Sequence, residues 1–145
     1  MSMDQLAHPS TALKSCRLTV TESVIRAYAE LTNDFNPIHL DAEFAAATPM
    51  RRPIAHGTIS LCLMWQCLGK NFPVDMLGAM HLDVRFVKPV YIGEELTAGG
   101  EPDSETSGQW KVWVRAQDGS DRIVGVLQGP GPAPNNSTSM ESRTA

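Results

Sequence analysis

Residues 57–69, Gly-Thr-Ile-Ser-Leu-Cys-Leu-Met-Trp-Gln-Cys-Leu-Gly, decide the fold of this chain. Apolar side chains occur on nearly every side of a helix drawn through them, whereas a surface helix keeps one polar face. Gly69 follows the last apolar residue and is a residue type that commonly ends a helix. We therefore predict a helix over 57–69 that lies at the centre of a domain, covered by other elements.

The covering elements are predicted mainly downstream, where four segments have the character of strands. They are residues 79–86, 95–100, 109–115 and 122–128. The first and third alternate apolar and polar residues, which is typical of a strand with one buried face. Residues 88–93 form a bend, and Asp118-Gly119 is a strong hairpin signal before the last strand. These four strands are therefore expected to be antiparallel.

Upstream of the central helix, the pattern predicts a strand over 14–20 and then a helix capped by Thr21 or Ser23. An irregular loop follows, and a short helix is expected over 42–46 after the cap residue Asp41. A curved antiparallel sheet wrapped around one long helix is an α+β arrangement. Such a sheet covers only part of the helix, so the exposed remainder predicts a partner subunit, most simply in a symmetric dimer.

Length and composition narrow the class of protein. The 145 residues suit one domain, with 42% hydrophobic residues, 19% charged residues and a net charge of −4. Nucleic acid is not an expected partner, because phosphate binding needs grouped cations. No apolar run reaches the length of a membrane span, and no signal core precedes the domain. Three cysteines without a paired spacing indicate a reduced, cytoplasmic protein.

The C-terminal residues differ in composition from the rest. Residues 129–145 contain Gly-Pro repeats followed by Asn, Ser and Thr, and offer almost nothing to bury. We predict a folded domain over 1–128 and a disordered tail over 129–145.

Residues 34–41, Asp-Phe-Asn-Pro-Ile-His-Leu-Asp, carry the chemistry. Asp34 and His39 are five residues apart, and Pro37 fixes its own φ and biases Asn36 away from helix. A rigid loop that directs a carboxylate and an imidazole to one point is what general acid–base catalysis requires. The alternative is an ordinary Asx turn, in which Asp34 and Asn36 accept backbone N–H groups and His39 is a surface residue.

Three segments together resemble the MaoC-like, (R)-specific enoyl-CoA hydratases, which have the hot-dog fold. They are residues 34–41, residues 52–57 (Arg-Pro-Ile-Ala-His-Gly) and residues 84–94 (Val-Arg-Phe-Val-Lys-Pro-Val-Tyr-Ile-Gly-Glu). The first is specific to hydratase-type hot-dog proteins, while the last is shared more widely. The resemblance extends from about Leu18 to Leu127 and implies reversible addition of water to a trans-2-enoyl-CoA, giving an (R)-3-hydroxyacyl-CoA.

The resemblance also implies roles for individual residues. Asp34 would activate a water molecule, while His39 would orient it and handle the proton at C2. Asn36, with Pro37, would fix the loop. The backbone N–H of Gly57, at the start of the central helix, would bind the thioester oxygen, which suits the unpaired N–H groups and the dipole of a helix N-terminus. No metal or separate cofactor is expected, because the histidines lack a metal-ligand spacing and coenzyme A belongs to the substrate.

Other residues have less specific expectations. His56 precedes the central helix and is expected to be structural, hydrogen-bonded to backbone, with a catalytic role as the alternative. Trp65 is expected in the core or in the acyl pocket, where some hydratases have a small hydroxyl residue. Arg51, Arg52 and Lys88 are candidates for contact with the CoA phosphates.

Two other functions remain open. A thioesterase is possible on the same fold, because fold alone does not determine function. The chain is also a candidate subunit of a heteromeric hydratase that acts on a bulky acyl-CoA, such as a steroid side-chain thioester. CoA is expected as the carrier rather than acyl carrier protein, because no docking patch of positive residues stands out.

Overall fold

The computed structural model describes residues 11–129. Its elements are β1 (Cys16–Thr19), α1 (Glu22–Thr32), α2 (Pro37–Leu40), α3 (Ala42–Ala46), α4 (Gly57–Asn71), α5 (Val74–Leu77), β2 (His81–Phe86), β3 (Glu95–Pro102), β4 (Gln109–Ala116) and β5 (Asp121–Gln128). The predicted disordered tail lies outside the described residues beyond residue 129. Within residues 11–129, no helix is both long enough and apolar enough to cross a membrane.

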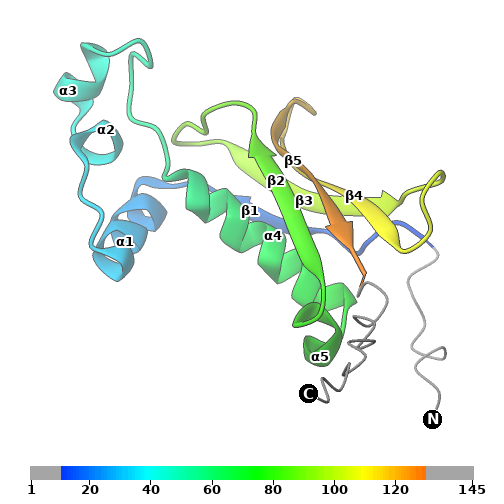
Figure 1. Cartoon of the computed structure of the whole chain (residues 1–145). Helices are drawn as coiled ribbons and strands as arrows, with labels where there is room; N and C mark the ends of the chain where they lie inside the picture. The colour runs from blue at the N-terminus through cyan, green and yellow to red at the C-terminus, as the bar shows by residue number, and fades with distance from the viewer. Residues whose placement is uncertain (1–10, 130–145) are drawn as a thin grey trace, which may run out of the picture.

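The strands form one antiparallel sheet in the order β1-β3-β4-β5-β2. Gly119 has a φ of 81° in the predicted turn between β4 and β5, a conformation that glycine adopts without strain. The sheet curves around α4, while α1, α2 and α3 stand away from it at one end of the molecule (Figure 1). This is the predicted α+β arrangement of a central helix and a wrapped sheet.

The core lies between α4 and the concave side of the sheet. From α4, Ile59, Leu63, Met64 and Leu68 are buried, and from the sheet so are Val112, Val114, Ile123 and Leu127. Burial of a side chain of this size contributes about 1.5–3 kcal/mol, so this contact dominates the stability of the fold.

The central helix differs from its prediction at its C-terminal end. It continues through Gly69 to Asn71, so Gly69 does not end it. Glycine inside a helix costs only about 0.5–1 kcal/mol, and the Asn71 side chain ties this last turn to the backbone carbonyl of Lys14 at 2.9 Å. The face of the helix away from the sheet is exposed at Cys62, Trp65 and Gln66, as expected for a helix that the sheet covers only in part.

Most other predicted bounds agree with the structure to within two residues, and the short helix over 42–46 is confirmed. Asp41 caps it as expected, accepting the backbone N–H groups of Glu43 and Phe44. Two short helices were not predicted. Residues 37–40, expected to be irregular, form the helical turn α2, because Pro37 suits the first helical position and the Asn36 side chain caps it. The other is α5, at residues 74–77.

Residues 33–56, here called the arm, are joined at Tyr91 to the connection between β2 and β3. Ile54 forms a β-bridge with Tyr91, and the Ala55 N–H donates to the Val90 carbonyl at 2.8 Å. The Arg52 guanidinium lies 4.0 Å from the centre of the Tyr91 ring. The arm is therefore attached to the β2–β3 connection through one short segment.

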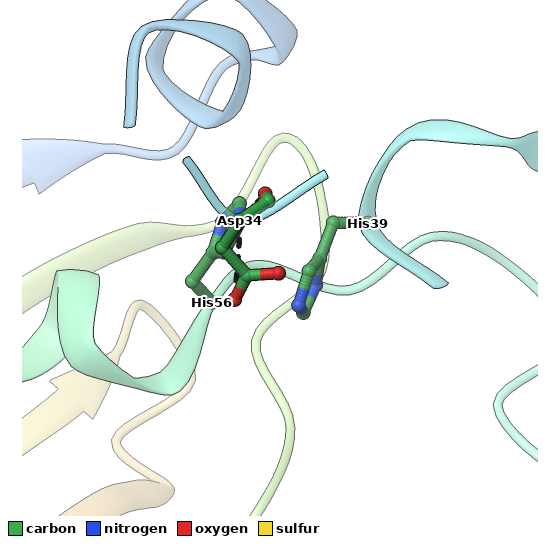
Figure 2. Close-up of side chains that lie close together, drawn as sticks. All are labelled: Asp34, His39 and His56. Atoms are coloured by element: carbon green, nitrogen blue, oxygen red, sulfur yellow. Dashed lines mark hydrogen bonds and ion pairs between the residues drawn. The ribbon is translucent and has the colours of Figure 1, made fainter. Parts of the chain in front are cut away.

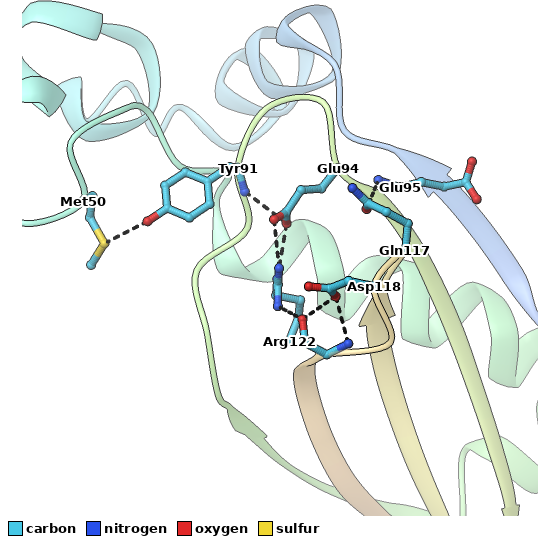
Figure 3. A network of polar contacts seen from close by, with 8 residues as sticks. Met50, Tyr91, Glu94, Glu95, Gln117, Asp118 and Arg122 are labelled. Carbon is cyan, nitrogen blue, oxygen red and sulfur yellow. Dashed lines mark hydrogen bonds and ion pairs between the residues drawn. The ribbon is translucent and has the colours of Figure 1, made fainter.

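A buried ion pair supports that segment from below (Figure 3). The guanidinium of Arg122 donates to both carboxylate oxygens of Glu94, at 2.8 and 3.2 Å, and to Ser120 Oγ at 2.6 Å. Glu94 also accepts the Tyr91 N–H at 3.3 Å. The hydrogen bond to Glu94, opposed in part by desolvation, raises the pKa of Arg122 above its usual value. Glu94 thus links the sheet to the residue that holds the arm.

Candidate active site

Asp34 is placed by the end of α1. Asn33 adopts the left-handed conformation with φ 55°, and the Asp34 N–H returns to the Ala29 carbonyl at 3.1 Å. Asp34 Oδ1 then accepts the Asn36 N–H at 3.2 Å, and Asn36 Oδ1 accepts the Ile38 N–H at 3.1 Å. The Asx turn that the sequence offered as an alternative is therefore present. The turn orients the Asp34 carboxylate and still leaves it accessible, since the Asp34 side chain remains 51% exposed.

His39 is carried by α2 and is half-buried. Its Nδ1 lies 2.7 Å from the backbone carbonyl of Ile54. A carbonyl oxygen accepts only, so Nδ1 carries the hydrogen and the neutral ring keeps a lone pair at Nε2. The contact fixes the tautomer and the ring plane of His39, as a base or an acceptor requires.

His56 occupies the N-cap position of α4 and is 2% exposed. Its Nε2 donates to the backbone carbonyl of Asp34 at 2.9 Å and lies 4.0 Å from Asp34 Oδ2. Its ring stacks on that of His39, with centroids 3.9 Å apart and planes at 29°. This agrees with the expected hydrogen bond to backbone, and it adds a direct contact with His39.

The side chains of Asp34, His39 and His56 point toward one another (Figure 2), and one candidate ligand atom from each lies within 4.8 Å of the others. A metal site has a similar spacing. Here, however, His56 Nε2 and His39 Nδ1 both donate to backbone carbonyls, and His56 Nδ1 is buried on a residue that does not line the pocket described below. The acceptors left for a small molecule are therefore His39 Nε2 and the Asp34 carboxylate. These two groups suit proton transfer to or from a small molecule between them.

A pocket of about 320 Å³ adjoins this centre. It is lined by His39, Met50, Ile54, Ala55, Gly57, Ser60, Phe86, Val87, Lys88, Pro89, Val90 and Arg122. Asp34 lies beside the pocket rather than in its lining. A Cβ atom on Gly57 would lie 3.2 Å from Phe86 Cε1, so glycine keeps this side of the pocket open. The imidazole of His39 and the first residue of α4 thus meet at one cavity.

Of the other residues proposed from the sequence, only some lie at the pocket. Lys88 lines the pocket. Arg52 lies over the Tyr91 ring, and Arg51 is exposed with φ 65°. Trp65 is 42% exposed on α4, so it is not part of the core, and it does not line this pocket.

Three residues at the site were not singled out by sequence. Ser60 and Arg122 are buried and line the pocket, and the ring of Tyr28 lies 5.0 Å from that of His56. A hydroxyl residue inside the apolar run 57–69 was a usable signal for Ser60. Arg122 had no such signal, because it looks like an ordinary surface residue in the sequence. Tyr28 recurs with Val24 and Leu31 at helical spacing, which indicates a packed helix face rather than a site.

Fold and site together define a hot-dog domain with a candidate acid–base centre beside the N-terminus of its central helix. A family model described as the MaoC-like domain matches residues 5–121. The chain belongs to this MaoC-like family.

Individual relatives agree with this assignment. An (R)-specific enoyl-CoA hydratase of Aeromonas caviae is 39% identical over 100 residues, which are 68% of this chain and 72% of that protein. A 3-hydroxybutyryl-CoA dehydratase of Methylorubrum extorquens is 39% identical over 77 residues, 52% of this chain and 48% of its own length. Both relatives are hydro-lyases. The solved structure of an (R)-hydratase of Aeromonas caviae superposes with a TM-score of 0.66 at 28% identity, covering 84% of this chain and 98% of that one.

Proposed function

We propose that this protein catalyses the reversible hydration of a trans-2-enoyl-CoA to an (R)-3-hydroxyacyl-CoA. The observation that carries the proposal is the convergence of the Asp34 carboxylate and the His39 imidazole beside one pocket, with the start of α4 in the pocket wall. The names of the Aeromonas caviae and Methylorubrum extorquens relatives support the same reaction class.

In the proposed mechanism, one water molecule lies between Asp34 and His39. His39 Nε2 orients it through a hydrogen bond, and the Asp34 carboxylate accepts a proton as the water oxygen bonds to C3. The C2–C3 double bond becomes single and charge develops on the thioester oxygen. The proton held by Asp34 then moves to His39 Nε2, and His39 delivers it to C2, so that both side chains regain their starting protonation states. A positioned acid–base pair of this kind contributes about 10²- to 10⁴-fold in rate.

We assign stabilisation of the negative charge on the thioester oxygen to a hydrogen bond from the backbone N–H of Gly57. It belongs to the first turn of α4, where N–H groups lack partners within the helix and the dipole favours negative charge. One preorganised donor of this type is worth on the order of 3 kcal/mol in the transition state. The open approach beside Gly57 allows the thioester to reach that N–H.

The proposed reaction uses no metal ion and no cofactor besides the coenzyme A of the substrate, since proton transfer and one N–H donor supply its chemistry. Lys88, at the pocket wall, is the cation we assign to the CoA phosphates. Arg52 is the weaker candidate because it already lies on the Tyr91 ring. CoA rather than acyl carrier protein is the proposed carrier.

We further propose that a second copy of the chain covers the exposed face of α4. Cys62, Trp65 and Gln66 lie on that face, and a helix with so few polar residues is otherwise left partly in water. Sedimentation of the purified protein tests this point. A homodimer supports it, whereas a monomer that dimerises only with a different hot-dog subunit favours the heteromeric alternative.

Loss of enoyl-thioester ultraviolet absorbance, measured with crotonyl-CoA and longer trans-2-enoyl-CoAs, tests the function. A chiral assay should identify the (R) product. Asp34→Asn should lower kcat about 10²- to 10⁴-fold because it removes the base. Asn still offers Oδ1 to the Asn36 N–H, so the loop should stay folded.

His39→Ala should lower kcat by a similar factor. The matched control for Asp34→Asn is Asp75→Asn, because Asp75 is an exposed residue of α5. Full activity in the Asp34 and His39 variants would refute the proposed mechanism. Release of free thiol from saturated acyl-CoA, without hydration, would identify a thioesterase instead.

A further inference from the structure

His56 contacts both members of the proposed catalytic pair without itself facing the pocket, whose lining includes its neighbours Ala55 and Gly57. We propose that His56 is a positioning residue for the hydratase reaction, which holds the backbone of Asp34 and the ring of His39 in their reactive arrangement. The inference rests on the proposed function and extends it to a third residue.

The first contact fixes Asp34. The His56 Nε2–H donates to the Asp34 carbonyl at 2.9 Å, from a ring that is 2% exposed. The Asp34 side chain is 51% exposed and accepts one backbone N–H, from Asn36. A carboxylate so close to solvent is directed mainly by its own backbone. The buried imidazole therefore sets where the Asp34 carboxylate points.

The second contact fixes His39. Its ring is tied at one edge to the Ile54 carbonyl, and its face is covered by the His56 ring at a centroid distance of 3.9 Å. Ring rotation would break the hydrogen bond and the stack together. His39 Nε2, the acceptor for the reacting water, is thereby held in a single direction.

The third observation separates positioning from simple packing. His56 Nδ1 is buried and has no hydrogen-bond partner among the described residues. An unsatisfied buried polar atom destabilises a fold, so an apolar ring would fill the same space at least as well. What imidazole adds over such a ring is its Nε2–H on Asp34, and that contact serves the site rather than the core.

Two substitutions test the Asp34 and His39 contacts of His56 separately. His56→Phe keeps a ring against His39 and loses the donor to the Asp34 carbonyl. His56→Gln keeps an N–H donor of similar reach and loses the ring. His81→Gln, an exposed histidine on β2, is the matched control. Hydration kinetics, thermal unfolding and amide hydrogen exchange of the Asn36 and Ile38 N–H groups should be measured for each full-length variant.

For His56→Phe we expect kcat to fall about 10- to 100-fold, the loss typical of a displaced catalytic group, while KM changes by less than about threefold. The melting temperature should remain near that of the wild type, and the Asn36 and Ile38 amides should exchange faster. His56→Gln should retain more of kcat than His56→Phe.

Wild-type kcat in His56→Phe, in an enzyme that hydrates enoyl-CoA, would overturn the positioning role and leave the proposed function intact. A parallel fall of kcat and melting temperature in both variants would overturn it in favour of a purely structural role. If the wild type shows no hydration, the function fails, and hydrogen exchange decides the inference. Unchanged exchange at Asn36 and Ile38 in His56→Phe would then refute it.

Discussion

Glu94→Gln tests the support beneath the arm. The Arg122 and Glu94 side chains are 8% and 15% exposed, and two hydrogen bonds join them at 2.8 and 3.2 Å. Glutamine has nearly the shape of glutamate, but its amide NH₂ would face a guanidinium N–H where a carboxylate oxygen now accepts. The substitution therefore leaves a buried positive charge without its counter-ion and removes one acceptor.

Breaking a buried pair on one side typically costs about 3–5 kcal/mol. We take the lower end, about 3 kcal/mol, because Ser120 still accepts one Arg122 N–H and the pair is partly reached by solvent. For domains near this size, a loss of 1 kcal/mol lowers the melting temperature by about 2–8 °C, so the melting temperature of the variant should fall by roughly 10 °C. Urea unfolding at neutral pH measures the free energy directly.

The neighbouring residue supplies the control. Glu95 is 50% exposed and lies 3.9 Å from Arg17, so Glu95→Gln should change stability by less than about 1 kcal/mol. The double variant Glu94→Gln with Arg122→Met should recover part of the loss, because it removes the unpaired charge. A loss below about 1 kcal/mol for Glu94→Gln alone would refute the reasoning, since it would mean that Arg122 is not effectively desolvated.

Further expectations concern buried polar and thiol groups. Ser60→Ala should leave the free energy of unfolding unchanged within about 1 kcal/mol or raise it, because Ser60 Oγ is buried with no partner among residues 11–129; a clear loss in urea unfolding would contradict this. A thiol reagent at pH 8 should modify the exposed Cys62 but not the buried Cys67, and Cys62 should react more slowly at protein concentrations where dimers form. Burial raises the pKa of Cys67 from 9.0 to about 11, so the unfolded chain loses this proton first and stability should fall as the pH rises from 9 to 11. The fall should be smaller in Cys67→Ala; an equal fall would show that other groups cause it.

The sequence was sufficient for the elements with a strong local signal. Thr21 and Asp41 cap the helices predicted after them, and Asp118-Gly119 forms the expected turn, since each acts within a few residues. Gly69 failed as a helix end because Asn71 is tied to Lys14, a contact 57 residues away that no local pattern contains.

The candidate site likewise has features that local sequence predicts and features that only the tertiary fold creates. Asp34 and His39 were expected to converge because Pro37 and Asn36 shape the four residues between them. The stack of His56 on His39 depends on the return of the chain from the arm to α4, which follows from the tertiary fold rather than from spacing. The residue type of Trp65 favours the core or a pocket. Trp65 is exposed instead, because the sheet does not reach its side of α4.

The arm contacts the β2–β3 connection over a short run that includes Ile54, Ala55 and Tyr91, whereas the sheet and α4 share a large buried core. Segments held by few buried contacts open at a lower free energy than the core they adjoin. Asp34 and His39 belong to the arm, so their arrangement depends on its closure. Heating should therefore inactivate this protein reversibly before the sheet melts, and the temperature range of activity is set by the arm rather than by the core.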